Sequence, residues 1–426
     1  MHDALNTPEG LRALATRDIG AVYRLLNAAG VPQRDIAAMT GQSQSKVSEI
    51  LKGRTVMGYD VFVKIAEGLG IPRGLMGLAY DEDLLPLLGE EAGEDMKRRA
   101  LLASGSIALF DRPVIGKLLD LPKRSDAPTP LPSRLGISDV EAVKALTSEL
   151  RGLARTYGGC ADTVTAIAAR SLQLMAIPGS EEVHASLASA LADLHTMAGW
   201  CCVDSGLHDN ARACFAMAMT LAPDDGYQFA LALRHAGIHM RDAGAYHDNL
   251  KACQLGLIKL GGSPDTPETA EAVAWLTAES GVAYAAMGHR FEAEKALRVA
   301  REHRLSNTFD EADMDYAAAE AYHRLGRLDI AEGFAASSFQ KWPATSHRDN
   351  VLSDIVLATI HVQSGEQDSP MLAHRAIKSV ASICSARARM NIRSLMEALE
   401  SRPRAEYREL AVLARRVVGQ KPPKNV

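Results

Sequence analysis

One glycine position repeats along the second half of the chain, with spacings of 38, 44, 38 and 39 residues between Gly206, Gly244, Gly288, Gly326 and Gly365. Alanine and leucine dominate the intervening segments, and both residues favour helix. A glycine between two helices at a fixed period is typical of helical hairpins. Because one hairpin cannot bury its apolar face alone, neighbouring hairpins must stack, which predicts an α-solenoid with a concave inner surface.

The motif within one period supports this interpretation. Residues 198–225, AGWCCVDSGLHDNARACFAMAMTLAPDD, have the aromatic, glycine, alanine and closing proline positions of a tetratricopeptide repeat, which they resemble. The pair Asp209 and Asn210 recurs 39 residues later as Asp248 and Asn249. The resemblance implies tetratricopeptide-like hairpins from residue 138 onward, with a degenerate helix pair at 138–195 and capping helices at the far end.

A second motif lies near the N-terminus, in residues 33–52, QRDIAAMTGQSQSKVSEILK. Ile36, Val47 and Ile50 point toward one shared core. Ala37 permits close packing of two helices, and Gly41 can supply the left-handed backbone of the turn between them. The pattern therefore predicts a helix-turn-helix, and the alternative is a helical hairpin within an all-helical protein.

The surrounding segment, 11–78, is predicted to hold five short helices, at 17–29, 32–40, 43–52, 59–69 and from residue 71. It resembles the DNA-binding domain of the Xre family, the lambda repressor and Cro type, at Gln33, Ala37, Gly41, Val47, Ile50 and the segments LKGR and KIAEGLGIP. Thr40 and Gln42 depart from the family pattern, and we expect them to weaken the packing of the turn slightly. TYGG at 156–159 and the GW-x4-SG run at 199–206 are similar to those of actinobacterial Xre regulators with tetratricopeptide domains.

These observations predict an all-α chain in three parts. Residues 1–78 form a five-helix helix-turn-helix domain, residues 79–137 a connector helix followed by a proline-rich linker, and residues 138–426 the tetratricopeptide-like array with C-terminal capping helices. The linker is predicted from an acidic patch and from five prolines between positions 113 and 132.

The resemblance implies a recognition helix whose first residues reach base edges in the major groove. Gln44 can bond adenine in a bidentate manner, and Lys46 can reach a guanine or a phosphate. Gln33 occupies the position where the family holds a phosphate. The full set of predicted DNA contacts is Gln33, Ser43, Gln44, Ser45, Lys46, Ser48, Lys52 and Arg54, and for each of them the alternative is a solvated polar side chain.

The concave face of the array is the predicted place for a ligand. Amide side chains at repeated positions could bond the backbone of an extended peptide. The polar candidates on this face are Asp204, Asn210, Arg234, His235 and Asn249. For Asn210 and Asn249, as for their neighbours Asp209 and Asp248, a helix cap is the preferred interpretation, since each follows a repeat glycine.

Composition excludes several classes of protein. The net charge of −5 is not that of a general polyanion binder, although residues 1–78 hold nine Lys and Arg against seven Asp and Glu. The phosphate-binding, hydrolase and zincin motifs are missing from the sequence, and His235 and His239 have no third metal ligand nearby. We expect no enzyme activity, no cofactor and no metal. Six cysteines without CxxC spacing and the lack of an apolar run of eighteen residues predict a cytoplasmic protein without a membrane span.

The sequence thus predicts a sequence-specific transcription regulator that binds double-stranded operator DNA as a homodimer. Its array is expected to mediate dimerisation and to sense a peptide or small-molecule effector. The alternative is a tetratricopeptide interaction scaffold with a helix-turn-helix headpiece that regulates nothing.

Overall fold

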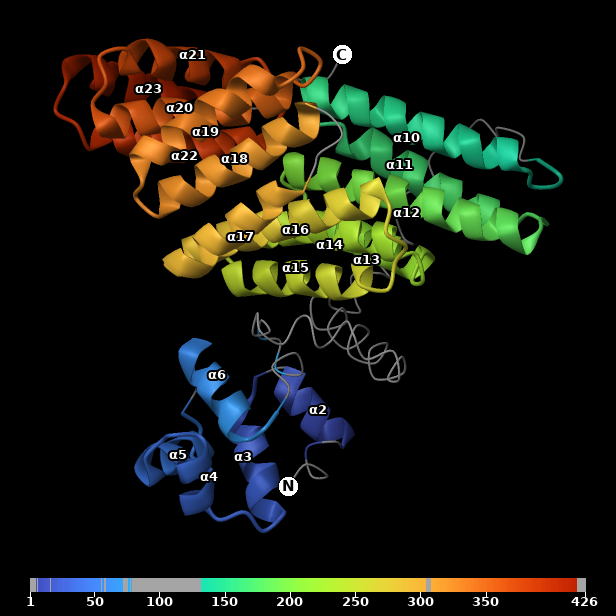
Figure 1. Ribbon diagram of the computed structural model, residues 1–426, viewed down its shortest axis with the longest axis vertical. Coiled ribbons are helices and arrows are strands. Elements are labelled where there is room, and N and C mark those ends of the chain that lie inside the picture. Colours follow the sequence, from blue (N-terminus) through green and yellow to red (C-terminus); the bar gives the residue numbers. More distant parts are fainter. Residues whose placement is uncertain are drawn as a thin grey trace.

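The computed structural model describes residues 5, 7–15, 17–54, 56, 59–71, 76, 78, 132–303 and 308–419. Within these ranges every regular element is a helix and there is no β-strand, so the predicted all-α class is confirmed (Figure 1). The connector helix and most of the linker expected at 79–137 lie outside the described residues, as does most of the short helix expected after residue 71.

The N-terminal unit, here called the headpiece, contains α2 (Pro8–Ala15), α3 (Ile19–Ala28), α4 (Gln33–Met39), α5 (Gln44–Leu51) and α6 (Tyr59–Gly68). Helix α2 was missed by the sequence analysis, which placed the first helix at 17–29. Arg17 has a left-handed backbone, with φ of 56°, and separates α2 from α3. Asp18 then caps α3 by accepting a hydrogen bond from the amide of Ala21.

The remaining described residues, 132–303 and 308–419, form the array. Its helices are α10 (Ile137–Tyr157), α11 (Ala161–Ser171), the 3₁₀ helix η4 (Leu172–Ala176), α12 (Glu181–Asp204), α13 (His208–Leu221), α14 (Gly226–Asp242), α15 (Tyr246–Leu260), α16 (Pro267–Ala286), α17 (Arg290–Glu302), α18 (Thr308–Arg324), α19 (Leu328–Lys341), α20 (His347–Ser364), α21 (Ser369–Ala381), α22 (Ala386–Glu400) and α23 (Ala405–Gly419). None of the helices described is long and apolar enough to cross a membrane.

Consecutive helices of the array pack in pairs, from α12 with α13 to α22 with α23. The first helices of successive pairs, α12, α14, α16, α18, α20 and α22, also contact one another in order. The result is a row of stacked hairpins whose apolar cores run from one pair into the next (Figure 1).

The repeat glycines have one structural role. All five lie between the two helices of a hairpin and have φ between 71° and 81°. After each glycine, the next amide donates to the carbonyl five residues earlier, at 2.8 to 3.1 Å, as in a Schellman motif. A residue with a Cβ is disfavoured in this left-handed backbone conformation. The positions of these glycines in the sequence therefore indicate where the first helix of each hairpin ends.

The predicted caps at the Asp-Asn pairs are wrong. Helix α13 follows Leu207 and α15 follows Ala245, and neither N-terminal residue forms a side-chain cap. The Schellman turn leads directly into the second helix, so the aspartates and asparagines fall inside its first turns. The side-chain caps lie instead before first helices, where Ser180, Asp225, Thr266 and Ser385 accept bonds from backbone amides.

The two ends of the array meet, which the repeat pattern did not predict. Helix α10 contacts α20, and α12 contacts α22. Asp204 accepts hydrogen bonds from Ser385 Oγ at 2.6 Å and from the amide of Gly159 at 3.2 Å. A Cβ on Gly158 would lie 2.6 Å from Asp204, which explains why the TYGG segment has glycine there. The array therefore closes on itself.

The headpiece contacts the array through Arg17, whose Nη2 lies 3.3 Å from the Asp248 carboxylate on α15. In Figure 1 helices α4 and α5 lie on the part of the headpiece that is remote from the array. The predicted recognition helix is therefore not covered by the described part of the array.

Candidate functional site

Helices α4 and α5 form the helix-turn-helix that the sequence predicted. Gly41 has φ of 62° and supplies the left-handed turn. Ile36, Val47 and Ile50 are buried in one headpiece core. Ser43 caps α5 by accepting a hydrogen bond from the Lys46 amide at 3.3 Å, so the start of the predicted recognition helix is held in place.

The outer face of α5 is polar and accessible. Gln44, Ser45 and Lys46 are exposed on its first turn, and Ser48 is half-buried one turn later. Gln33 is half-buried at the start of α4, beside the free amides of that helix end. After α5, Lys52 and Arg54 are exposed, and Arg54 forms an ion pair with Glu49. Most of the predicted DNA contacts are therefore exposed, Gln33 and Ser48 are half-buried, and the Ser43 hydroxyl serves as a helix cap.

The two departures from the family pattern have polar partners within the turn. Gln42 accepts a hydrogen bond from the Tyr23 hydroxyl at 3.0 Å, and Thr40 donates to the Ile36 carbonyl at 2.7 Å. Burial raises the pKa of Tyr23 to about 12, so its hydroxyl remains a donor at any physiological pH. The expected weakening of the turn is therefore offset by bonds that satisfy buried polar groups.

Gly68 is a residue that sequence reasoning missed. A Cβ there would lie 1.9 Å from the carbonyl oxygen of Met39, at the end of α4. Only glycine allows α6 to pack this closely against the helix-turn-helix. The available signal was a glycine at the end of the expected helix, but a glycine there is also a common helix stop.

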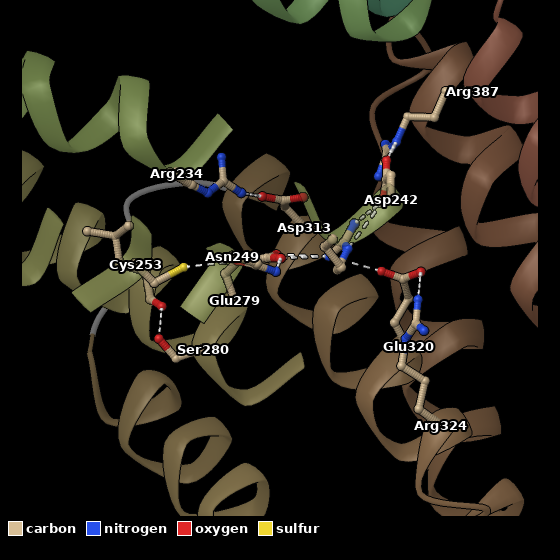
Figure 2. Close-up of polar contacts among 12 residues, drawn as sticks. Arg234, Asp242, Asn249, Cys253, Glu279, Ser280, Asp313, Glu320, Arg324 and Arg387 are labelled. Carbon is tan, nitrogen blue, oxygen red and sulfur yellow. Dashed lines mark hydrogen bonds and ion pairs between the residues drawn. The ribbon is translucent and has the colours of Figure 1, made fainter. Parts of the chain in front are cut away.

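A second candidate site is a cavity of about 270 Å³ on the inner side of the array. Helices α10, α12, α14, α16, α18, α20 and α22 all contribute lining residues. Of the predicted ligand contacts, Arg234 and His235 lie in this lining. Arg234 forms an ion pair with Asp313, another lining residue (Figure 2). Its guanidinium lies 5.1 Å from the centre of the Trp275 ring.

The structure places the other three predicted contacts elsewhere. Asp204 is buried at the junction of the two array ends, as described above. Asn249 is fully buried and donates to Glu279 Oε1 at 2.8 Å (Figure 2). Asn210 is half-buried in the first turn of α13 and does not line the cavity.

A buried charge network forms one wall of the cavity. Arg241 Nη1 donates to both oxygens of Glu279, at 2.8 and 3.1 Å, and lies 3.1 Å from Glu320. Burial alone would lower the pKa of Arg241, but these carboxylates raise it well above its usual range. For the carboxylate of Asp242 the signs are reversed. Burial by itself would raise its pKa, but Arg387 and Arg241 lower it below the usual value. Arg241 and Asp242 therefore stay ionised, each with an opposite charge beside it. For Glu279 the effect of burial is the larger one, and its pKa is raised although Arg241 and Asn249 lower it.

All three tryptophans of the chain, Trp200, Trp275 and Trp342, line the cavity. Only Trp200 is part of a motif recognised in the sequence, as the aromatic position of the repeat in residues 198–225. The three positions, separated by 75 and 67 residues, follow no repeat interval, so only the three-dimensional structure reveals that they share one cavity.

Comparison with known proteins bears on the headpiece. Residues 22–75 match a helix-turn-helix family model, and this range includes α4, α5 and α6. No curated protein matches the chain. The match assigns the headpiece to the helix-turn-helix type, which binds DNA and regulates transcription, and leaves the array to be interpreted from its own residues.

Proposed function

We propose that this chain is a sequence-specific transcription regulator in which α5 reads operator DNA and the array, a set of tetratricopeptide-like hairpins, controls that activity. The observation that carries the proposal is the exposed polar face of α5 within a segment matching the helix-turn-helix family. A recognition helix needs such a face, because base edges are read by hydrogen bonds from its first residues.

The residues divide into two roles. Gln44, Ser45, Lys46 and Ser48 are the proposed base contacts, since they follow the capped start of α5. Gln33, Lys52 and Arg54 flank them and are proposed to bind phosphates, which fix the register of the helix in the groove. A phosphate would compete with Glu49 for Arg54, because these two side chains are paired in the free protein.

Two-fold symmetry is part of the proposal. One headpiece offers four base-contacting side chains, and paired half-sites about one helical turn apart would multiply their discrimination. We propose that the array supplies the dimer contact and that it responds to a signal, because it makes up most of the chain and contains a lined cavity.

The experiment is selection of preferred sequences from random DNA by the full chain, followed by fluorescence anisotropy at physiological salt. We expect a preferred site with two related halves. The double variant Gln44→Ala, Lys46→Ala should weaken specific binding roughly a hundredfold or more, since each base contact contributes about 1–3 kcal/mol.

The matched control is Lys144→Ala, which removes an exposed lysine from α10. It should leave DNA affinity unchanged, and circular dichroism should show equal helicity for all variants. If the double variant keeps full specific affinity, α5 is not the recognition helix. Weak, salt-sensitive binding without a preferred sequence would favour the interaction scaffold instead.

A further inference from the structure

The cavity in the array has polar groups that the fold does not satisfy. Within the part of the chain that the structure describes, the Tyr316 hydroxyl, Trp275 Nε1 and Gln228 Oε1 are buried and have no hydrogen-bond partner. Tyr316 is only 7% exposed, and all three residues line the cavity. Such groups destabilise a folded chain unless a partner is supplied, so they are the first indication of a ligand.

The charges of the lining argue against a polyanion. Although several arginines surround the cavity, five of them are already paired with carboxylates, as Arg151 with Asp193, Arg234 with Asp313, Arg241 with Glu279, Arg348 with Asp349 and Arg387 with Asp242. A phosphate or nucleotide would have to displace these carboxylates from the guanidinium groups. Arg234 Nε, Arg348 Nε and Asp349 Oδ2 in the lining also have no hydrogen-bond partner among the described residues, but their side chains are already ion-paired. Tyr316, Trp275 and Gln228 are instead neutral and offer two donors and one acceptor.

Five tryptophan and tyrosine side chains are among the residues that line the cavity. The three tryptophans are joined there by Tyr227 and Tyr316. Trp200 is already covered by Arg348 and Arg387, whose guanidinium carbons lie 5.3 and 5.0 Å from its ring centre. Surfaces of this kind favour a planar ring, because aromatic faces and edges attract one another beyond simple burial.

The volume limits the size of the occupant. A cavity of about 150 Å³ holds one benzene. The 270 Å³ found here is therefore suited to about two fused rings. It lies below the range of roughly 300–1,000 Å³ that holds drug-sized ligands, so an extended peptide of several residues would not fit inside.

We propose that the array binds, in this cavity, a planar aromatic molecule of about two rings that has a hydrogen-bond donor and acceptor edge and carries little or no charge. That this molecule is the signal that controls DNA binding rests on the proposed regulatory function. Its binding in the cavity is independent of that function. Arg348 and Arg387 link the cavity to the junction that closes the array. Both line the cavity, and at the junction Arg348 lies near Asp204 and Arg387 pairs with Asp242.

The test uses the full chain without DNA and follows tryptophan fluorescence, because every tryptophan of the protein lines the cavity. The probe is quinoline carboxamide, a neutral planar two-ring amide. We expect one site per chain with a Kd of about a millimolar or tighter, from the affinity that a ligand of this size commonly reaches. Decahydronaphthalene carboxamide, which has the same neutral amide but no flat ring, should bind roughly tenfold more weakly.

Two variants locate the probe. Tyr316→Phe should weaken it roughly five- to tenfold by removing one hydrogen-bonding hydroxyl. Ala317→Leu, which adds volume to the lining, should prevent binding, whereas Ala142→Leu at an exposed position of α10 should have no effect.

Three results would overturn the proposal. One is the failure of the probe to bind, another is equal or tighter binding of inorganic pyrophosphate or of the saturated amide, and the third is unchanged affinity in both Tyr316→Phe and Ala317→Leu. DNA binding is measured separately by anisotropy, so loss of one activity would not be mistaken for loss of the other.

Discussion

Replacing Tyr316 by phenylalanine should make the free protein more stable. The hydroxyl is buried and, among the described residues, has no hydrogen-bond partner, while burial raises the pKa of Tyr316 well above its usual value and keeps the group neutral. An unsatisfied buried polar group costs about 1–3 kcal/mol. Phenylalanine keeps the ring and removes this cost, so we expect the free energy of unfolding to rise by about 1 kcal/mol.

Tyr407→Phe is the matched control. Its hydroxyl is also buried, but it lies 2.6 Å from Ser369 Oγ, with which it shares a hydrogen bond. Removing that bond should lower the free energy of unfolding by about 0.5–1.5 kcal/mol. The two substitutions are chemically identical, so their opposite signs isolate the effect of the partner.

Urea unfolding followed by tryptophan fluorescence measures both variants, since all three tryptophans belong to the array. Thermal unfolding should show a rise in Tm of about 2 °C for Tyr316→Phe. If that variant loses as much stability as Tyr407→Phe, the Tyr316 hydroxyl has a partner in the folded chain, and the reasoning about unsatisfied groups in the cavity is refuted.

The remaining predictions concern packing, charge and pH. Gly68→Ala should destabilise the headpiece by about 1–3 kcal/mol, seen as faster hydrogen exchange in α6, whereas Gly333→Ala on open helix surface should stabilise the array slightly. Arg387→Met should cost about 3 kcal/mol in urea unfolding because it removes one of the two arginines that pair with the buried Asp242 and leaves only Arg241, whereas the exposed Arg415→Met should cost less than about 1 kcal/mol. Burial lowers the pKa of His195 to about 4, so the unfolded chain binds the extra proton first as pH falls from 6.5 to 4. The free energy of unfolding should therefore fall as pH drops through this window, and at pH 5 the loss should be roughly 2 kcal/mol. His195→Met should remove this part of the loss, which thermal unfolding measured from pH 7.5 to 4.5 would show.

Much of the local structure could be predicted from the sequence because it depends on short-range rules. The repeat glycines end helices by their backbone freedom, Gly41 makes the turn before α5, and Ser43 caps that helix. The order of helices and the exposed face of α5 follow from such positions together with the period of apolar residues. The caps assigned to the Asp-Asn pairs failed because a Schellman turn already satisfies the backbone beside them.

The sequence by itself determined the all-α class, the helix-turn-helix of the headpiece and the row of hairpins, since each depends on residues that lie close together in the chain. Only the tertiary structure decided that Asp204 meets Ser385 across 181 residues, closing the array, and that Trp200, Trp275 and Trp342 line one cavity. Small rotations between successive hairpins add up along the array, and their total cannot be predicted from the residues of any one repeat. For that reason the position of α5 could be predicted, but the cavity in the array could not.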